Sequence, residues 1–70
     1  MMPIGKVKSW GADKGYGFIV PDDGGPDVFV HISQVMSSIN LQHDQFVSYE
    51  VELNERNDKP QATRVRVLEG

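Results

Sequence analysis

The stretch KGYGFIV, residues 14–20, is the part of this sequence that decides the fold. It places Tyr16 and Phe18 at alternate positions with a glycine before each ring, and such alternation is typical of a β-strand. Glycine is normally unfavourable in a strand, because it adds backbone entropy cost and no side chain to pack. We interpret Gly15 and Gly17 as positions where the missing Cβ lets rings lie over the backbone and lets the strand bend.

Length and composition point to one small domain over residues 1–70, near the lower size limit of what folds unaided. The absence of cysteine excludes disulfides and thiolate metal sites, and His31 and His43 are too few to form a metal centre. We therefore expect no cofactor. The sequence contains neither a run of about 20 apolar residues nor a signal-peptide apolar region, so we expect a soluble cytoplasmic protein with no membrane contact.

Turn-forming segments such as WGADKG, PDDGGPD and NERNDKP divide the sequence at regular intervals. One helical turn is expected at 33–36, with Ser33 as its cap. We predict an all-β fold, a five-stranded antiparallel OB-fold barrel. The five predicted strands lie near residues 4–10, 15–20, 27–32, 46–53 and 61–68.

Alternation along the first three predicted strands sorts their side chains onto two faces. Aliphatic residues occupy one parity and suit a barrel interior, whereas rings and lysines occupy the other. The predicted inward set is Val7, Ile19, Val28 and Val30. The predicted outward set is Lys6, Lys8, Trp10, Tyr16, Phe18, Phe29 and His31.

An outer face that combines flat rings with lysines suits single-stranded nucleic acid. Unpaired bases stack on rings at roughly 1–3 kcal/mol per base, and lysines contact phosphates without reading sequence. The net charge of −3 argues mildly against this partner, but Lys and Arg gather at both ends of the chain and are absent from residues 15–55. If the two ends meet in space, one face becomes positive. Aromatic pairs in small β proteins are more often core residues, so this assignment depends on the shared parity of rings and lysines.

Two motifs resemble those of bacterial cold-shock proteins. KGYGFI at 14–19 is similar to their RNP1 motif and VFVHI at 28–32 to their RNP2-like motif, and GKVK at 5–8 and PQA at 60–62 extend the likeness. In an RRM the order of the two motifs is reversed, so the resemblance is to cold-shock proteins. It implies an OB barrel that binds single-stranded RNA or DNA with little sequence preference. It also implies an RNA chaperone that melts weak RNA structure and influences transcription or translation under stress. The binding residues carried over by this resemblance are Lys6, Lys8, Trp10, Lys14, Tyr16, Phe18, Phe29, His31 and Gln61.

The sequence departs from the family pattern at several binding positions. Ser9 stands where the family usually has tryptophan, and Ile32 where it often has phenylalanine. The loop at 36–45 is shorter and lacks an aromatic residue, and Arg56 is displaced from the position of a family arginine. These changes predict a narrower binding surface and weaker binding.

The sequence allows comparison with two other classes of function, a protein-docking module and an enzyme. A barrel whose weakened surface became a docking patch for a protein is compatible with Ser9, Ile32 and the acidic charge. An enzyme is disfavoured, because the sequence has no phosphate loop, metal set or nucleophile–base pair. We expect a monomer that binds single-stranded nucleic acid and takes no small-molecule substrate.

Overall fold

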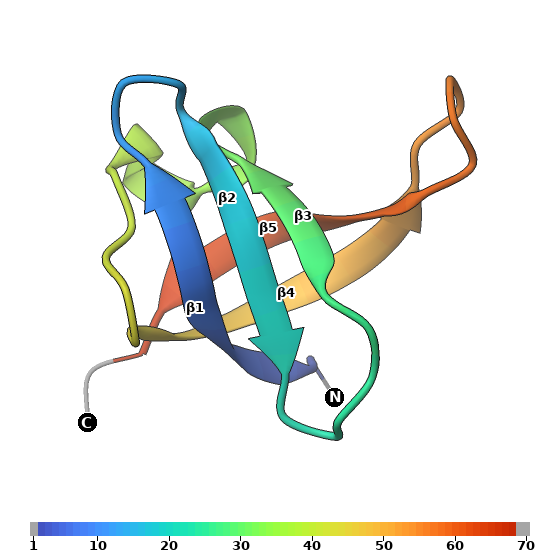
Figure 1. Ribbon diagram of the computed structural model, residues 1–70, viewed down its shortest axis with the longest axis horizontal. Coiled ribbons are helices and arrows are strands. Elements are labelled where there is room, and N and C mark those ends of the chain that lie inside the picture. Colours follow the sequence, from blue (N-terminus) through green and yellow to red (C-terminus); the bar gives the residue numbers. More distant parts are fainter. Residues whose placement is uncertain (1, 69–70) are drawn as a thin grey trace.

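Five strands form a closed barrel in the computed structural model, which describes residues 2–68. Around the barrel the strands follow the order β1-β2-β3-β5-β4, so the predicted all-β, five-stranded barrel is confirmed. Strands β1, β2 and β3 lie side by side, with β4 and β5 crossing behind them (Figure 1). The strands are β1 (Ile4–Gly11), β2 (Tyr16–Pro21), β3 (Val28–His31), β4 (Phe46–Leu53) and β5 (Pro60–Val67).

The barrel closes through one parallel pairing. β3 pairs with β5 in parallel, with Phe29 opposite Gln61, whereas the other four pairings are antiparallel. The prediction of an antiparallel sheet therefore holds for four of the five strand pairs. The parallel pair brings Gln61, from the last strand, beside the aromatic residues of the third.

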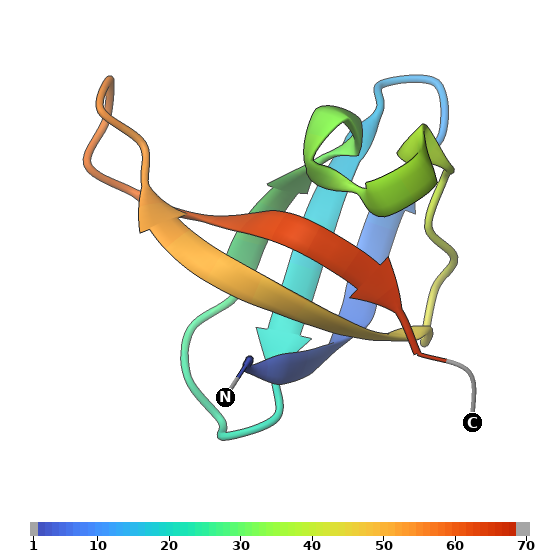
Figure 2. The ribbon, with the colours of Figure 1, turned by 180° about the vertical axis from the view of Figure 1, so that it is seen from behind.

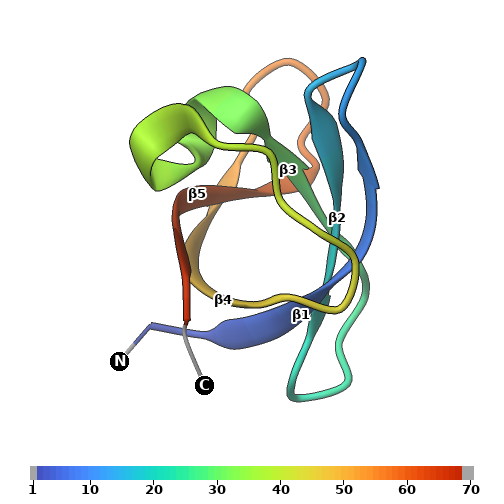
Figure 3. The same ribbon diagram turned by 90° about the vertical axis from the view of Figure 1, so that its left-hand side faces the viewer.

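The core lies inside the barrel and consists mainly of branched aliphatic side chains. Val7, Ile19, Val28 and Val30 are all buried, which confirms the predicted inward set. Seen along the barrel, the strands enclose this core and the segment after β3 covers one end (Figure 3). The other members of the core are Val35, Leu41, Val47, Tyr49, Ala62 and Val65.

A β-bulge in β1 changes which side chains share the outer face. The register with β2 shifts between Val7 and Ser9, so that Ser9 lies opposite Phe18 and Trp10 opposite Gly17. A bulge adds one residue to one strand and thereby reverses the alternation beyond it. The predicted face of Trp10 was therefore wrong: Trp10 packs partly against the core, and Ser9 takes the outward position beside Phe18.

The ring clearance predicted for the two glycines of the opening stretch is not the reason that the structure requires them. A Cβ on Gly17 would lie 2.0 Å from the carbonyl oxygen of Ser9, so glycine is required where β2 meets the bulge of β1. Gly15 has a φ of +76°, a left-handed conformation that favours glycine, and its carbonyl accepts a hydrogen bond from the backbone of Ile32. Gly17 is therefore not needed to give the aromatic rings room, because its missing Cβ would face the β1 backbone.

The segment after β3 contains two short 3₁₀ turns, η1 (Ile32–Gln34) and η2 (Met36–Ser38). The helical turn predicted at 33–36 is present as η1 but begins at Ile32, and the predicted cap was wrong, because His31 and not Ser33 caps η1. Its ring accepts a hydrogen bond from the backbone N–H of Ser33. Both turns lie on the side of the barrel seen from behind (Figure 2).

Within residues 2–68, no helix is both long and apolar enough to cross a membrane. The same described part of the chain contains no group of three or more His, Asp or Glu side chains arranged to hold a metal ion.

Candidate nucleic-acid interface

Three aromatic side chains form one exposed cluster on β2 and β3, here called the aromatic platform: Tyr16, Phe18 and Phe29. The Phe29 ring lies between the other two, with its centroid 5.6 Å from that of Tyr16 and 5.9 Å from that of Phe18. Tyr16 is 36% exposed and Phe18 39%, while Phe29 is half-buried. Phe29 thus holds the two outer rings in place, and their faces remain accessible to a planar ligand.

His31 extends the aromatic platform at the end of β3, where it lies opposite Tyr16, the first residue of β2. Its Nδ1 accepts a hydrogen bond from the Ser33 backbone N–H at 3.1 Å and lies 2.9 Å from the Ser33 hydroxyl. A ring nitrogen that accepts from an amide carries no proton, which assigns the proton of the neutral ring to Nε2. The exposed His31 ring therefore offers an N–H donor beside a stacking surface.

Trp10 lies at the end of β1 and is half-buried. Its indole N–H donates to the Asn40 side chain at 3.0 Å, which ties β1 to the segment between η2 and β4. Because this donor is already used, Trp10 can offer a ligand only the exposed part of its ring. Ser9 occupies the outward position on β1 opposite Phe18. Because Ser9 has no ring, β1 adds no aromatic side chain to the platform at this position.

The predicted lysines lie on β1 and in the β1–β2 turn, next to the β2 strand of the aromatic platform, and two of them have acidic partners. Lys8 forms an ion pair with Asp27 at 2.9 Å, and Lys6 lies 3.7 Å from Asp44. These pairs are exposed and therefore weak, so a phosphate can compete for either lysine at small cost. Lys14, in the β1–β2 turn before Tyr16, has no ion-pair partner within residues 2–68.

A hollow of about 480 Å³ borders Phe18 and Phe29 on the side facing the β4–β5 turn. Gln61 lines it, and its side-chain oxygen accepts a hydrogen bond from the Asn54 amide at 3.3 Å. Arg56 and Lys59 also line the hollow, and neither was among the predicted binding residues. Arg56 is displaced along the sequence from the position of the family arginine, but the β4–β5 turn brings it to the hollow beside Phe18 and Phe29.

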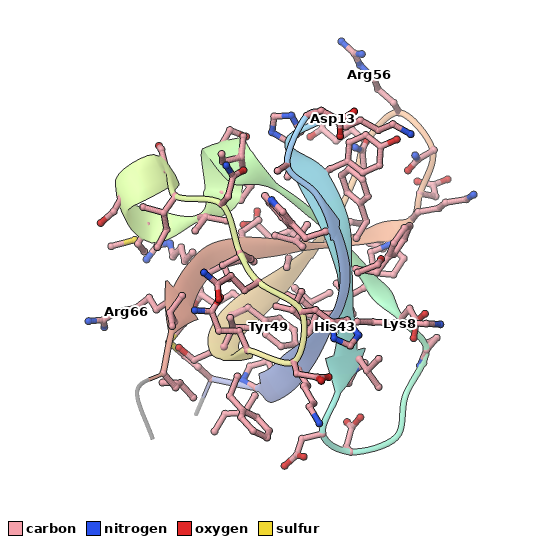
Figure 4. The ribbon with its side chains drawn as sticks, turned by 60° about the vertical axis from the view of Figure 1, so that its left-hand side comes forward. Lys8, Asp13, His43, Tyr49, Arg56 and Arg66 are labelled. Carbon is pink, nitrogen blue, oxygen red and sulfur yellow. The ribbon has the colours of Figure 1, made fainter. Side chains whose placement is uncertain are left out.

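Only some of the basic residues near the two ends of the sequence come together beside the aromatic platform. Arg56 projects from the β4–β5 turn, and Arg66 points away on the opposite side of the molecule (Figure 4). Arg64 pairs with Glu50 at 3.2 Å. The positive charge available near the rings therefore comes from Lys14, Arg56 and Lys59, together with the two paired lysines.

The segment at 36–45 contributes no ring to the aromatic platform. Ile39, which stands near the position of the missing family aromatic, lines a separate hollow with Met36 and Arg66. Asn40 is held by Trp10. The sequence predicted that this segment lacks an aromatic residue, and Ile39 does not replace it, because its side chain lines a different hollow.

Comparison with known proteins identifies the family. Residues 4–68 match the family described as the 'Cold-shock' DNA-binding domain. This chain belongs to the cold-shock domain family. Such domains bind single-stranded nucleic acids, and the arrangement of rings and cations on β1, β2 and β3 is consistent with that activity.

Several bacterial cold-shock proteins resemble the chain over nearly its full length. A probable cold shock protein A of Mycolicibacterium smegmatis is 45% identical over 96% of this chain and 100% of its own. The cold shock-like protein CspA of Bordetella pertussis is 39% identical over the same shares. The cold shock-like protein CspG of Escherichia coli is 44% identical over 91% of each chain.

A solved structure shows the same fold. Drosophila Unr CSD456 superposes on 99% of this chain with a TM-score of 0.78 and 23% sequence identity. The match covers 27% of that longer chain, and at this identity it supports the fold alone.

Proposed function

We propose that this cold-shock domain is an RNA chaperone, which stacks unpaired bases on Tyr16, Phe18 and Phe29 and thereby holds weak RNA structure open. The observation that carries the proposal is the exposure of these rings next to cationic side chains. A duplex keeps its base faces stacked, so flat exposed rings favour single strands. Cytoplasmic action as a monomer, without catalysis or a small-molecule substrate, is part of the same proposal.

The residues proposed to bind nucleic acid fall into three groups with different tasks. The rings stack bases, the His31 N–H and the Gln61 amide offer hydrogen bonds, and the cations contact phosphates. Trp10 is proposed as a peripheral contact, since its ring is half-buried and its N–H is engaged. The full set is Lys6, Lys8, Trp10, Lys14, Tyr16, Phe18, Phe29, His31 and Gln61, to which Arg56 and Lys59 are added.

Binding of single strands is expected to be weaker than in a family member that carries all the usual aromatic residues. Each missing ring removes roughly 1–3 kcal/mol of stacking. The ion pairs of Lys6 and Lys8 must also exchange their carboxylates for phosphates. Moderate affinity suits a chaperone, because the protein must release strands as they anneal.

The direct test measures single-stranded RNA binding by Phe18→Ala and Phe29→Ala variants, using the anisotropy of a labelled oligonucleotide. Each variant should weaken binding by at least about 1 kcal/mol, roughly fivefold in Kd. Met36→Ala is the control, because Met36 is also apolar and exposed but lies in η2, away from the aromatic platform. Unchanged binding in both ring variants, with the barrel still folded by circular dichroism, would refute the proposal.

Chaperone activity needs a separate measurement. Adding the protein to a weak RNA hairpin that carries a fluorophore and quencher should raise its fluorescence, and Phe18→Ala should reduce that effect. If binding occurs without hairpin opening, the domain binds single strands but does not act as a chaperone. If neither is seen, the protein-docking interpretation of the same surface becomes the better account.

A further inference from the structure

A further exposed aromatic ring lies outside the aromatic platform, on the other side of β1. Phe46, the first residue of β4, is 49% exposed. The Lys6 ammonium lies 5.6 Å from the centre of this ring, within the range of a cation–π contact. An exposed phenylalanine beside a lysine repeats the combination found on the platform.

Strand register connects Phe46 to the aromatic platform across one continuous outer face. Val20 lies opposite Lys6 across β2 and β1, and Lys6 lies opposite Phe46 across β1 and β4. Val20 is exposed and follows Tyr16 and Phe18 on the outer parity of β2. With strands about 4.8 Å apart and residues about 3.4 Å apart, Phe46 lies roughly 12 Å from Phe18 along the sheet. OB folds bind about 4–16 nucleotides of a single strand, so one strand can reach both rings.

A hollow of about 440 Å³ lies along this path. Its lining includes Val20 and Phe46, with Lys6 between them, and also Lys8. This volume falls within the range of roughly 300–1,000 Å³ that is typical of small-ligand sites. The space is therefore large enough for a nucleobase to lie against Phe46.

The charges around this hollow indicate how a nucleotide would lie in it. Asp22 and Asp44 also line the hollow. A phosphate placed next to Asp22, which has no ion-pair partner within residues 2–68, would be repelled, whereas Asp44 is the partner of Lys6. Lys6 and Lys8 border the same space, and each is held by an exposed carboxylate that a phosphate can replace. His43 lies on the Asp44 side, 3.2 Å from that carboxylate. The base therefore fits at Phe46, and its phosphate at the lysines.

We propose that Phe46 and Lys6 form an additional stacking subsite for an unpaired base, continuous with the aromatic platform through Val20. The proposal rests on the proposed single-strand binding and extends it, because the subsite is filled only by strands long enough to cross β1. Phe46 thereby restores on β4 part of the ring surface that Ser9 and the 36–45 segment lack.

The test compares oligothymidylates of about four and about ten nucleotides, because a short strand can occupy the platform without reaching β4. Phe46→Ala should weaken binding of the longer strand at least about fivefold, the lower end of what one stacked base contributes, and leave the shorter strand unchanged. Phe46→Trp should retain the tighter binding of the longer strand. Lys6→Gln should lower the salt slope for the longer strand by about 0.7, the value for one phosphate.

Controls separate the failure of this subsite from failure of the proposed function. Phe18→Ala should weaken both strands, and Met36→Ala neither. If Phe18→Ala has no effect on either length, the proposed function itself fails. If Phe18→Ala weakens both but Phe46→Ala weakens neither, or weakens both equally, the Phe46 subsite is refuted. Phe46→Leu keeps apolar bulk without the ring, so it gives the same test should Phe46→Ala fail to fold.

Discussion

Replacing Ser9 with tryptophan adds a ring to the aromatic platform at the position where the bulge of β1 leaves a gap. Ser9 is exposed and lies opposite Phe18, so a tryptophan there points to the same side of the sheet. The change fills no cavity and breaks no hydrogen bond described for the Ser9 side chain in residues 2–68. Because the variant is expected to gain function, partial unfolding cannot produce the predicted result.

The size of the gain follows from stacking. One added base–ring contact is worth roughly 1–3 kcal/mol, which corresponds to about a 5- to 150-fold lower Kd. The lower end is expected, because neighbouring stacking contacts are not additive. The Lys8–Asp27 pair beside the bulge also restricts the space that the new ring can take.

Titration of a labelled single-stranded oligonucleotide, followed by anisotropy, measures this gain for Ser9→Trp against the parent protein. Ser9→Leu serves as the matched control, because it adds apolar area at the same place without a ring face. Met36→Trp adds a tryptophan on η2, away from the platform, and should change nothing. An unchanged Kd for Ser9→Trp, or an equal gain for Ser9→Leu, would refute the view that position 9 faces stacked bases.

Three further predictions concern stability and electrostatics. Gly17→Ala places a Cβ against the Ser9 carbonyl, so it should lower stability by about 2 kcal/mol or more and Tm by roughly 8–16 °C; an unchanged melting curve would contradict the bulge geometry. Burial, with Asp23 and then Asp22 adding to it, raises the pKa of the Tyr49 phenol above its usual 10.0. The folded protein therefore holds this proton more tightly than the unfolded chain, so the Tyr49 contribution is fully present below pH 10 and is lost as pH rises above it. Urea titrations should show that Tyr49→Phe has a smaller loss of stability above pH 10 than the parent, and equal losses would oppose this assignment. Finally, phosphate contacts by three to five of the cations near the rings predict a salt slope of about −2.1 to −3.5 for single strands; a much steeper slope would mean that cations elsewhere on the protein take part.

Most of the fold could be predicted from alternation. Val7, Ile19, Val28 and Val30 carry the inward parity and are buried, because the inward face of a closed barrel is shielded from water. The parallel β3–β5 pairing was not predictable in this way, because strand direction depends on how the last strand closes the barrel.

The bulge in β1 explains the main error in the predicted faces. The sequence of β1 alone does not distinguish an unbroken strand from one that contains a bulge. The register shift becomes visible only in the pairing with β2, where Gly17 lets the Ser9 carbonyl approach. Trp10 therefore turned towards the core while Ser9 took its place outside. The same limit applies to Arg56, whose proximity to Phe18 depends on the path of the β4–β5 turn.

The sequence does not indicate Phe46 as a binding residue, for a different reason. Its segment FVSYEVEL alternates correctly, but one exposed ring at the start of a strand gives no signal by itself. Only the register of β4 with β1 places it beside Lys6 on the outer face. Neighbouring strands, rather than spacing along the chain, therefore determine which rings can bind one ligand.

The most direct test of the central claim compares one RNA sequence as a single strand and as a duplex with its complement, at the same low salt concentration. The account predicts that the single strand binds at least about tenfold more tightly, a difference of about 1.4 kcal/mol, and that Phe18→Ala removes most of this preference. Equal binding of the two forms, or a preference that survives Phe18→Ala and Phe29→Ala together, would contradict base stacking on the aromatic platform.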